Sequence, residues 1–161
     1  MIENEAGVIA DSLWTATANP TPLCPPLTAE IDCNVAIIGA GFTGLSAAVH
    51  LAERGQRVVV LEAQTPGWGA SGRNGGQVNP GLKEDPDTIE ERFGADMGAR
   101  MIALSGGAGQ FVFDLIARHG IACDARQTGW VQPFHNAASE QVVRRRVAQW
   151  TRRGASLRIL D

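Results

Sequence analysis

Two runs of consecutive apolar residues frame a helical pattern in the first half of the chain. Val35 to Ile38 and Val58 to Leu61 are apolar at every position, as is typical of parallel strands covered on both faces. The residues between them favour a helix from Thr43 to Arg54, which Gly55 would end. Apolar residues recur in that helix at the spacing i, i+3, i+4 and i+7, namely at Leu45, Ala48, Val49 and Ala52. The pattern predicts a strand, a helix and a second strand in one βαβ unit.

The remainder of the chain begins with a glycine-rich loop from Gly67 to Gly81 and then shows further periodic segments. We expect a short helix over 86–93, a long helix over 97–119 and a strand from Thr128 to Phe134. A further helix is expected from Ala138 to Arg153, and a further strand from Leu157 to Leu160. Gly106, Gly107 and Gly109 fall inside the long helix, and each costs about 1 kcal/mol relative to alanine there. These glycines favour a kink or a break at that point.

The segment 1–31 carries several prolines and little periodicity, which predicts an extended leader that packs along the domain surface. We expect no chemistry from this leader. The four tryptophans of the chain are interpreted as packing residues: Trp14, Trp68, Trp130 and Trp150.

Composition and charge narrow the class of protein. The chain has 161 residues, of which 44% are hydrophobic and 19% charged, values that fit one globular domain and exclude a disordered polymer. The net charge is −3, and the basic excess is confined to the arginines of 139–161. We interpret that cluster as a solvated helix face. Nucleic-acid binding is not expected, because such domains usually present a basic face throughout.

Cysteine usage and the N-terminal sequence indicate a reducing, cytoplasmic location. The three cysteines form no CxxC pair and lie near no histidine cluster, so we expect neither a disulfide framework nor a metal site. The chain opens with acidic residues, not with a basic segment followed by an apolar run, so no secretory signal is expected. The apolar stretch from Val35 to Ala52 is explained by the strand, turn and helix, so we expect no membrane association.

A dinucleotide-binding motif lies between the first strand and the first helix. Gly39, Gly41 and Gly44 form a GxGxxG pattern, which is weak alone but strong where it joins a strand to a helix. The first glycine permits a tight turn, the second lets the backbone approach a pyrophosphate, and the third lets helix and strand pack closely. The helix N-terminus favours an anion there without lysine or arginine.

An acidic residue follows at the expected distance. Glu62 ends the second strand, and its spacing from Gly39 is close to that at which a carboxylate accepts hydrogen bonds from the adenosine ribose. The same carboxylate would repel a 2′-phosphate, which excludes NADP and leaves FAD or NAD. A non-binding βαβ unit with a strand-end acid is the alternative at this point.

At these residues the sequence resembles the FAD-dependent amine and D-amino-acid oxidase family. The matching segments are SLWTATANP, VAIIGAGFTGLSAAVHLAERGQRVVVLEA, GWGASGRNGGQV, IEERFG and ARHGIACD. They span nearly the whole chain, and GWGASGRNGGQV is the most telling of them. The resemblance implies FAD as the cofactor, with Ser71, Gly72 and Arg73 near its pyrophosphate and Asn74, Gly75 and Gly76 reaching toward the flavin ring.

The residues of that loop suit this role. Its glycines let backbone amides point at a ligand, and the Arg73 guanidinium can bind phosphate oxygens in a fork. On composition alone, an ordinary surface loop is the alternative. The full set of predicted cofactor contacts is Gly39, Gly41, Phe42, Thr43, Gly44, Glu62, Ala63, Ser71, Gly72, Arg73, Asn74, Gly75 and Gly76.

The resemblance also implies the fold and the domains. We expect an α/β fold: an incomplete Rossmann-like FAD-binding βαβ unit, of the glutathione-reductase-like FAD/NAD(P)-binding type, followed by the start of an α+β substrate domain. Residues 1–31 would be the leader, 32–127 the N-terminal part of the FAD-binding domain, and 128–161 the truncated start of the substrate domain.

The implied activity is oxidation of the C–N bond of a small amine or amino acid by hydride transfer to flavin N5. Family members are more than twice this long, so we expect no catalytic side chain here, and the missing half would come from a longer protein or a partner chain. The isolated chain should show no turnover and should hold FAD weakly or not at all. Two other interpretations are an NAD-binding dehydrogenase fragment and a non-catalytic FAD-binding remnant or subunit.

Overall fold

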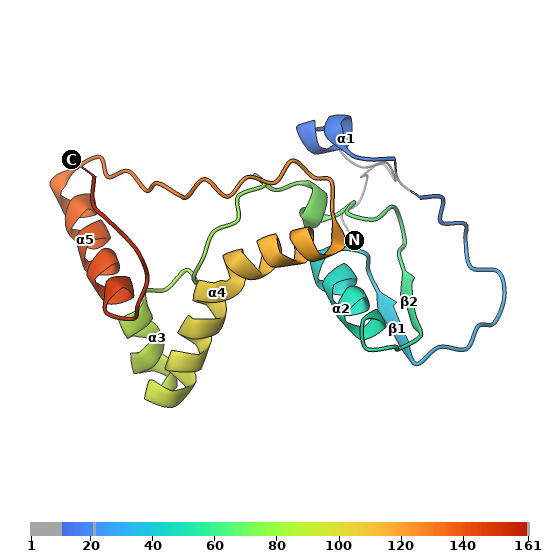
Figure 1. Ribbon diagram of the computed structural model, residues 1–161, viewed down its shortest axis with the longest axis horizontal. Helices are drawn as coiled ribbons and strands as arrows, with labels where there is room; N and C mark the ends of the chain where they lie inside the picture. Colours follow the sequence, from blue (N-terminus) through green and yellow to red (C-terminus); the bar gives the residue numbers. More distant parts are fainter. Residues whose placement is uncertain (1–10, 21, 161) are drawn as a thin grey trace. The chain divides into compact units, whose positions relative to one another are not determined.

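A computed structural model describes residues 11–20 and 22–160 of the chain (Figure 1). The chain forms two compact units, the first running to Gln77 and the second beginning at Val78.

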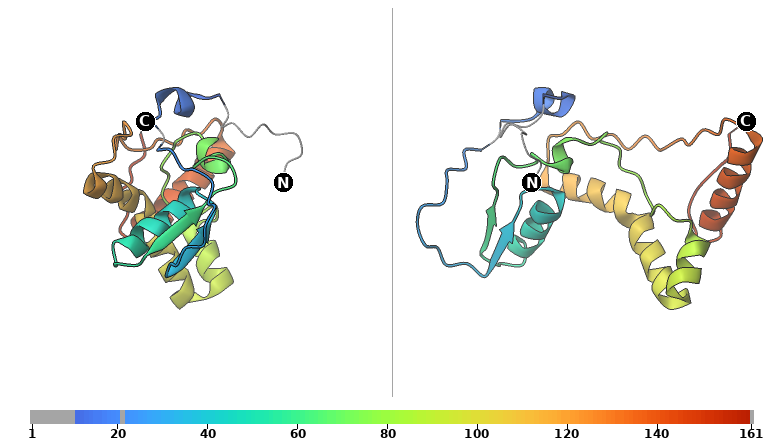
Figure 2. Two further views of the ribbon diagram at one scale, coloured as in Figure 1. Left: turned by 90° about the vertical axis from the view of Figure 1, so that its right-hand side faces the viewer. Right: turned by 180° about the vertical axis from the view of Figure 1, so that it is seen from behind.

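The first unit contains the predicted βαβ arrangement. Strands β1 (Val35–Ile38) and β2 (Val58–Leu61) pair in parallel, with Val35 opposite Val58 and Ile38 opposite Leu61. Helix α2 (Phe42–Ala52) connects them and packs against both, as Figures 1 and 2 show. The strand bounds are those predicted, whereas the helix begins one residue earlier and ends two residues earlier than expected.

The sheet is covered less completely than the continuous apolar runs predict. Along β1, half-buried and exposed positions alternate, and Ile38 is 90% exposed. Helix α2 packs on these strands, and the exposed positions of β1 are left uncovered by the described residues. The expectation of strands covered on both faces is therefore wrong for this chain by itself, because an apolar run shows only what could be buried.

The leader contains a short helix, so the prediction of an extended segment is wrong at these residues. Helix α1 (Leu13–Thr17) begins after Ser12, whose hydroxyl oxygen accepts a hydrogen bond from the Thr15 N–H at 3.4 Å. Serine at this position supplies an acceptor for one of the N–H groups that a first helical turn leaves unpaired. Ala18 to Pro20 and 22–31 have no regular secondary structure, and residues 1–10 lie outside the described part.

The second unit is a group of three helices. Helices α3 (Pro86–Phe93) and α4 (Ala95–His119) are joined by one residue, Gly94, which has a positive φ of 79°. Helix α5 (Ala137–Thr151) packs against α3. The helix predicted over 86–93 is confirmed at both ends, α4 begins two residues before its predicted start, and α5 differs from its prediction by one residue at the start and two at the end.

Glycines allow close contacts along α4. A Cβ on Gly98 would lie 2.7 Å from the Glu90 Cα, so this glycine lets α3 approach the α4 backbone. A Cβ on Gly106 would lie 3.0 Å from the Trp150 ring. The helix continues without a break through the three central glycines, and Figure 1 shows it bending midway, which agrees with the expected kink.

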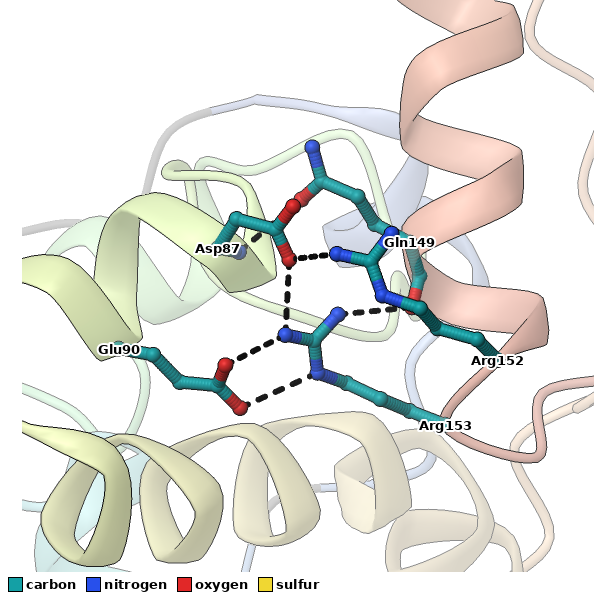
Figure 3. A network of polar contacts seen from close by, with 5 residues as sticks. All are labelled: Asp87, Glu90, Gln149, Arg152 and Arg153. Carbon is teal, nitrogen blue, oxygen red and sulfur yellow. Dashed lines mark hydrogen bonds and ion pairs between the residues drawn. The ribbon is translucent and has the colours of Figure 1, made fainter.

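Two arginines that directly follow α5 bind acidic residues of α3 (Figure 3). Arg153 donates to Glu90 with Nε at 3.2 Å and Nη2 at 2.7 Å, and Nη2 also lies 2.8 Å from Asp87 Oδ1. Arg152 contacts the same Asp87 oxygen. The Arg153 side chain is only 18% exposed. The interpretation of these arginines as a solvated face is therefore wrong for Arg153, which links two helices.

This network makes the stability of the second unit sensitive to acid. The Arg152 guanidinium, followed by Arg153, holds the pKa of Asp87 below its ordinary value. Because the folded-state pKa is lowered, the stabilisation is fully present above the unfolded pKa of about 4 and is lost as pH falls through the folded value.

We expect Arg153→Gln to reduce the free energy of unfolding at pH 7 and to reduce it less at pH 3. Urea unfolding at both pH values measures this, with exposed Arg145→Gln on α5 as the control. Equal losses at both pH values would contradict the prediction.

Two predicted strands are not formed. Residues from Thr128 to Phe134 and from Leu157 to Leu160 have no strand pairing in the described structure, and Val131 is 70% exposed. A strand requires a hydrogen-bonded neighbour, and local composition does not supply one.

The described helices include none that is long and apolar enough to cross a membrane.

Candidate functional site

The candidate site lies in the first unit, where β1 turns into α2. Gly39 has a φ of 99°, a conformation that side chains rarely allow, and its N–H donates to the Leu61 carbonyl at 2.7 Å. A Cβ on Gly44 would lie 2.0 Å from the Gly39 carbonyl oxygen and 3.2 Å from Ile37 Cγ2. The turn can therefore pack on the helix only because Gly44 lacks a side chain, which is the role predicted for the third glycine.

The N-terminus of α2 presents backbone donors at this turn. Gly41 caps the helix with an extended backbone (φ −85°, ψ −177°) and makes no side-chain cap bond. The first N–H groups of an α-helix have no intrahelical acceptor, and the helix dipole favours an anion beside them. Thr43 lies in this first turn. The start of α2 therefore offers backbone N–H donors at the place where the sequence predicts an anion site.

Ser71 closes on the same turn from the glycine-rich loop. It belongs to a short 3-10 helix, η1 (Ala70–Gly72), and its hydroxyl oxygen accepts a hydrogen bond from the Phe42 N–H at 2.9 Å. A Cβ on Gly41 would lie 3.0 Å from that oxygen. The structure therefore brings Ser71 together with the glycine motif, although the whole of α2 and β2 separates the two in sequence.

Glu62 supports the turn from the end of β2. One carboxylate oxygen accepts from the Ala40 N–H at 2.7 Å, and the other accepts from the Gln64 N–H at 3.0 Å. These two backbone hydrogen bonds, that of Ala40 first, lower the pKa of Glu62 and keep it ionised at neutral pH. The supporting contact to Ala40 was missed from the sequence, where only the spacing from Gly39 marked the residue.

Arg73 is held against Trp68 within the loop. Its Nε donates to the Trp68 carbonyl at 3.0 Å, and its guanidinium carbon lies 4.7 Å from the centre of the Trp68 ring. This cation–π contact fixes the side chain of the residue predicted to bind phosphate oxygens. Trp68 itself is half-buried.

The segment after η1 is organised by the Asn74 side chain. Its amide nitrogen donates to the Ser71 carbonyl at 2.7 Å, and its oxygen accepts from the Gly76 N–H at 2.8 Å. The Asn74 carbonyl in turn accepts from the Trp14 indole N–H at 2.7 Å. Nothing in the sequence signals the Trp14 contact beyond the presence of SLWTATANP among the matching segments.

The predicted residues therefore fall into two adjoining groups. The glycine motif, Phe42, Glu62 and Ser71 meet around one turn, and Asn74, Gly75 and Gly76 follow along the exposed loop beyond η1. The three cysteines are free thiols.

Most of the chain matches a known protein family. Residues 34–161 match the family described as FAD dependent oxidoreductase, abbreviated DAO. This range covers the βαβ unit, the glycine-rich loop and the second unit.

Curated relatives are similar over much of the chain but are far longer. The chain is 42% identical over 118 residues to gamma-glutamylputrescine oxidoreductase of Escherichia coli (strain K12), which covers 73% of this chain and 28% of that protein. It is 34% identical over 142 residues to a probable oxidoreductase, OrdL, of Rhizobium meliloti (strain 1021), covering 88% of this chain and 33% of that protein. The chain thus spans about a third or less of the length of these relatives. No solved structure matches significantly.

Proposed function

Because the chain belongs to the family of FAD-dependent oxidoreductases, we propose that it binds FAD, with the ADP half at the turn between β1 and α2. The carrying observation is the meeting of the α2 N-terminus, Gly41 and an ionised Glu62 at one turn. The proposed contacts are Gly39, Gly41, Phe42, Thr43, Gly44, Glu62, Ala63, Ser71, Gly72, Arg73, Asn74, Gly75 and Gly76.

The chemistry of this turn suits an adenosine diphosphate. Backbone N–H groups and the α2 dipole favour the pyrophosphate, and the missing Cβ of Gly41 leaves room for it. Each Glu62 oxygen accepts one backbone hydrogen bond, and a carboxylate has further acceptor capacity for a ribose hydroxyl. The negative charge disfavours a 2′-phosphate, which supports FAD over NADP.

The glycine-rich loop is positioned to contact the rest of the cofactor. Ser71 is already held at the helix N-terminus, and Arg73 is fixed on Trp68 nearby in the chain. We therefore place Ser71, Gly72 and Arg73 beside the pyrophosphate and the segment Asn74 to Gly76 toward the flavin ring.

The reaction that fits the family is oxidation of the C–N bond of an amine or amino acid. When bound, FAD supplies a hydride acceptor at N5. The residues of this chain bind and orient the cofactor, and we assign none of them a catalytic role. Since the chain spans less than a third of gamma-glutamylputrescine oxidoreductase, the substrate site would come from further sequence or from a partner chain.

Titration of the purified chain with FAD, ADP and NAD tests the proposal. We expect FAD binding that ADP inhibits, detected by changes in flavin absorbance and fluorescence. Binding of NAD in preference to FAD would favour a dehydrogenase fragment and contradict the proposal. Absence of ADP binding would contradict the site itself.

Turnover by the chain alone is a separate measurement. We expect no peroxide release with amines or D-amino acids, because none of the described residues is assigned to substrate. A full-length relative assayed in parallel is the control. Robust turnover by this chain alone would contradict the expectation and direct attention to Arg73 and Asn74.

Replacing Glu62 tests the ribose contact. Glu62→Gln keeps the shape of the side chain but sets an NH₂ group against one of two backbone donors, Ala40 or Gln64. We expect FAD to bind more weakly by about 1–3 kcal/mol, as for loss of a hydrogen bond to a charged acceptor. Calorimetric titration measures the affinity, and Glu53→Gln, at the exposed C-terminal end of α2, is the control. Unchanged affinity would mean that the ribose is held elsewhere.

A further inference from the structure

The leader helix α1 is anchored to the glycine-rich loop through one side chain. Trp14 donates its indole N–H to the Asn74 carbonyl at 2.7 Å, a contact between residues 60 positions apart in the sequence. The tryptophan is still 40% exposed, so the contact does not bury it in a core. An indole N–H aimed at one backbone carbonyl indicates a directional role in addition to apolar packing.

Gly76 is the second partner of Trp14. It has a positive φ of 68°, and a Cβ at this position would lie 2.5 Å from Trp14 Cη2 and 2.7 Å from Cζ2. The indole ring thus occupies the space of the missing side chain. We call Trp14, Asn74 and Gly76 together the tryptophan seat.

The seat is connected to the turn of the candidate site by successive hydrogen bonds. Asn74 accepts from Trp14 through its carbonyl and donates through its side-chain amide to the Ser71 carbonyl at 2.7 Å. The Ser71 hydroxyl then accepts from the Phe42 N–H at the start of α2. Ser71 therefore lies between the two parts, with its hydroxyl at the turn and its carbonyl bound to the seat.

We propose that Trp14 is a positioning residue that holds the segment from Asn74 to Gly76 in the conformation that receives the flavin half of FAD. This inference rests on the proposed function. The segment is glycine-rich and exposed, so ordering it has a high entropic cost. The Trp14 ring against Gly76 and the hydrogen bond to Asn74 order the segment before the cofactor binds. This preorganisation raises the affinity for FAD.

The test compares the two halves of the cofactor in the full chain. We expect Trp14→Ala to weaken FAD binding about tenfold and to leave ADP binding within about twofold, because ADP contacts the turn but not the seat. Trp14→Phe keeps a ring but loses the N–H donor and should fall between Trp14→Ala and the wild type. Gly41→Val, in contrast, should weaken the binding of both FAD and ADP.

Leu13→Ala is the matched control, since Leu13 is an exposed residue of the same short helix. It should change neither affinity. If Trp14→Ala weakens FAD and ADP equally, or weakens neither, the inference is overturned. Equal weakening would show that the leader merely stabilises the unit.

Amide hydrogen exchange without ligand separates this inference from the proposed function. Trp14→Ala should accelerate exchange in 74–77 and leave α2 unchanged, which a general loss of stability would not do. If the wild-type chain binds neither ADP nor FAD, the proposed function fails and so does the cofactor role of the seat. If the chain binds both ligands but exchange in 74–77 is unaffected by Trp14→Ala, only the seat is overturned.

Discussion

Gly44→Ala is expected to destabilise the first unit severely, because its Cβ would lie 2.0 Å from the Gly39 carbonyl oxygen. The obstacle is backbone at a turn already held at positive φ, so it cannot rotate away as a side chain would. Relief requires α2 to move off β1, where Ile37 is also in contact. We expect a loss at or above the upper end of the roughly 1–3 kcal/mol that is typical of overpacking. Urea unfolding of the chain measures it.

Gly107→Ala is the matched control for this substitution. Gly107 also lies inside a helix, α4, but a Cβ there would meet no atom within 4 Å. The same change should therefore stabilise by up to about 1 kcal/mol, through helix propensity alone. Similar effects of the two substitutions would show that the contact between Gly44 and Gly39 is not what constrains the turn.

Gly41→Val is expected to leave the fold intact and to weaken FAD and ADP binding by about 1–3 kcal/mol, or roughly 5- to 150-fold. The backbone of Gly41 is extended, a conformation that valine adopts readily. The nearest atom to its Cβ would be the Ser71 hydroxyl oxygen at 3.0 Å, which can turn aside only by giving up its hydrogen bond from the Phe42 N–H. The branch would instead fill the space proposed for the pyrophosphate.

Ala47→Val, at an exposed position of α2, adds branching to the same helix away from the turn. It controls for general effects on helix stability and should leave both affinities near wild type. Thermal unfolding of each variant distinguishes loss of binding from loss of structure. Wild-type affinity in a folded Gly41→Val chain would mean that the phosphates bind elsewhere.

The βαβ unit could be predicted from sequence because its signals are local. The apolar runs at Val35 to Ile38 and Val58 to Leu61 indicate both strands, and the glycine spacing indicates the turn between strand and helix. Glu62 could be found by its spacing from Gly39. The strands and the turn depend on residues close together in the chain, where hydrophobic period and backbone conformation are sufficient.

Contacts between distant residues were not predictable in the same way. Trp14 reaches Asn74 across 60 positions, and Arg153 reaches Glu90 across 63. No periodicity encodes such pairs, so composition alone predicts a packing role for Trp14 and a solvated one for Arg153. The strands expected from Thr128 to Phe134 and from Leu157 to Leu160 are wrong for a related reason, since pairing depends on a partner strand.

The single-residue joint at Gly94 has a consequence for how the second unit folds. Because one glycine ends α3 and starts α4, contacts between these helices join residues that are close in the chain, such as Glu90 and Gly98. Closing so short a loop loses little entropy, and local contacts form faster than distant ones. Docking of α5 must close a far longer loop, which includes the whole of α4, to bring Arg152 to Asp87. The α3–α4 hairpin should therefore form first and provide the surface against which α5 packs.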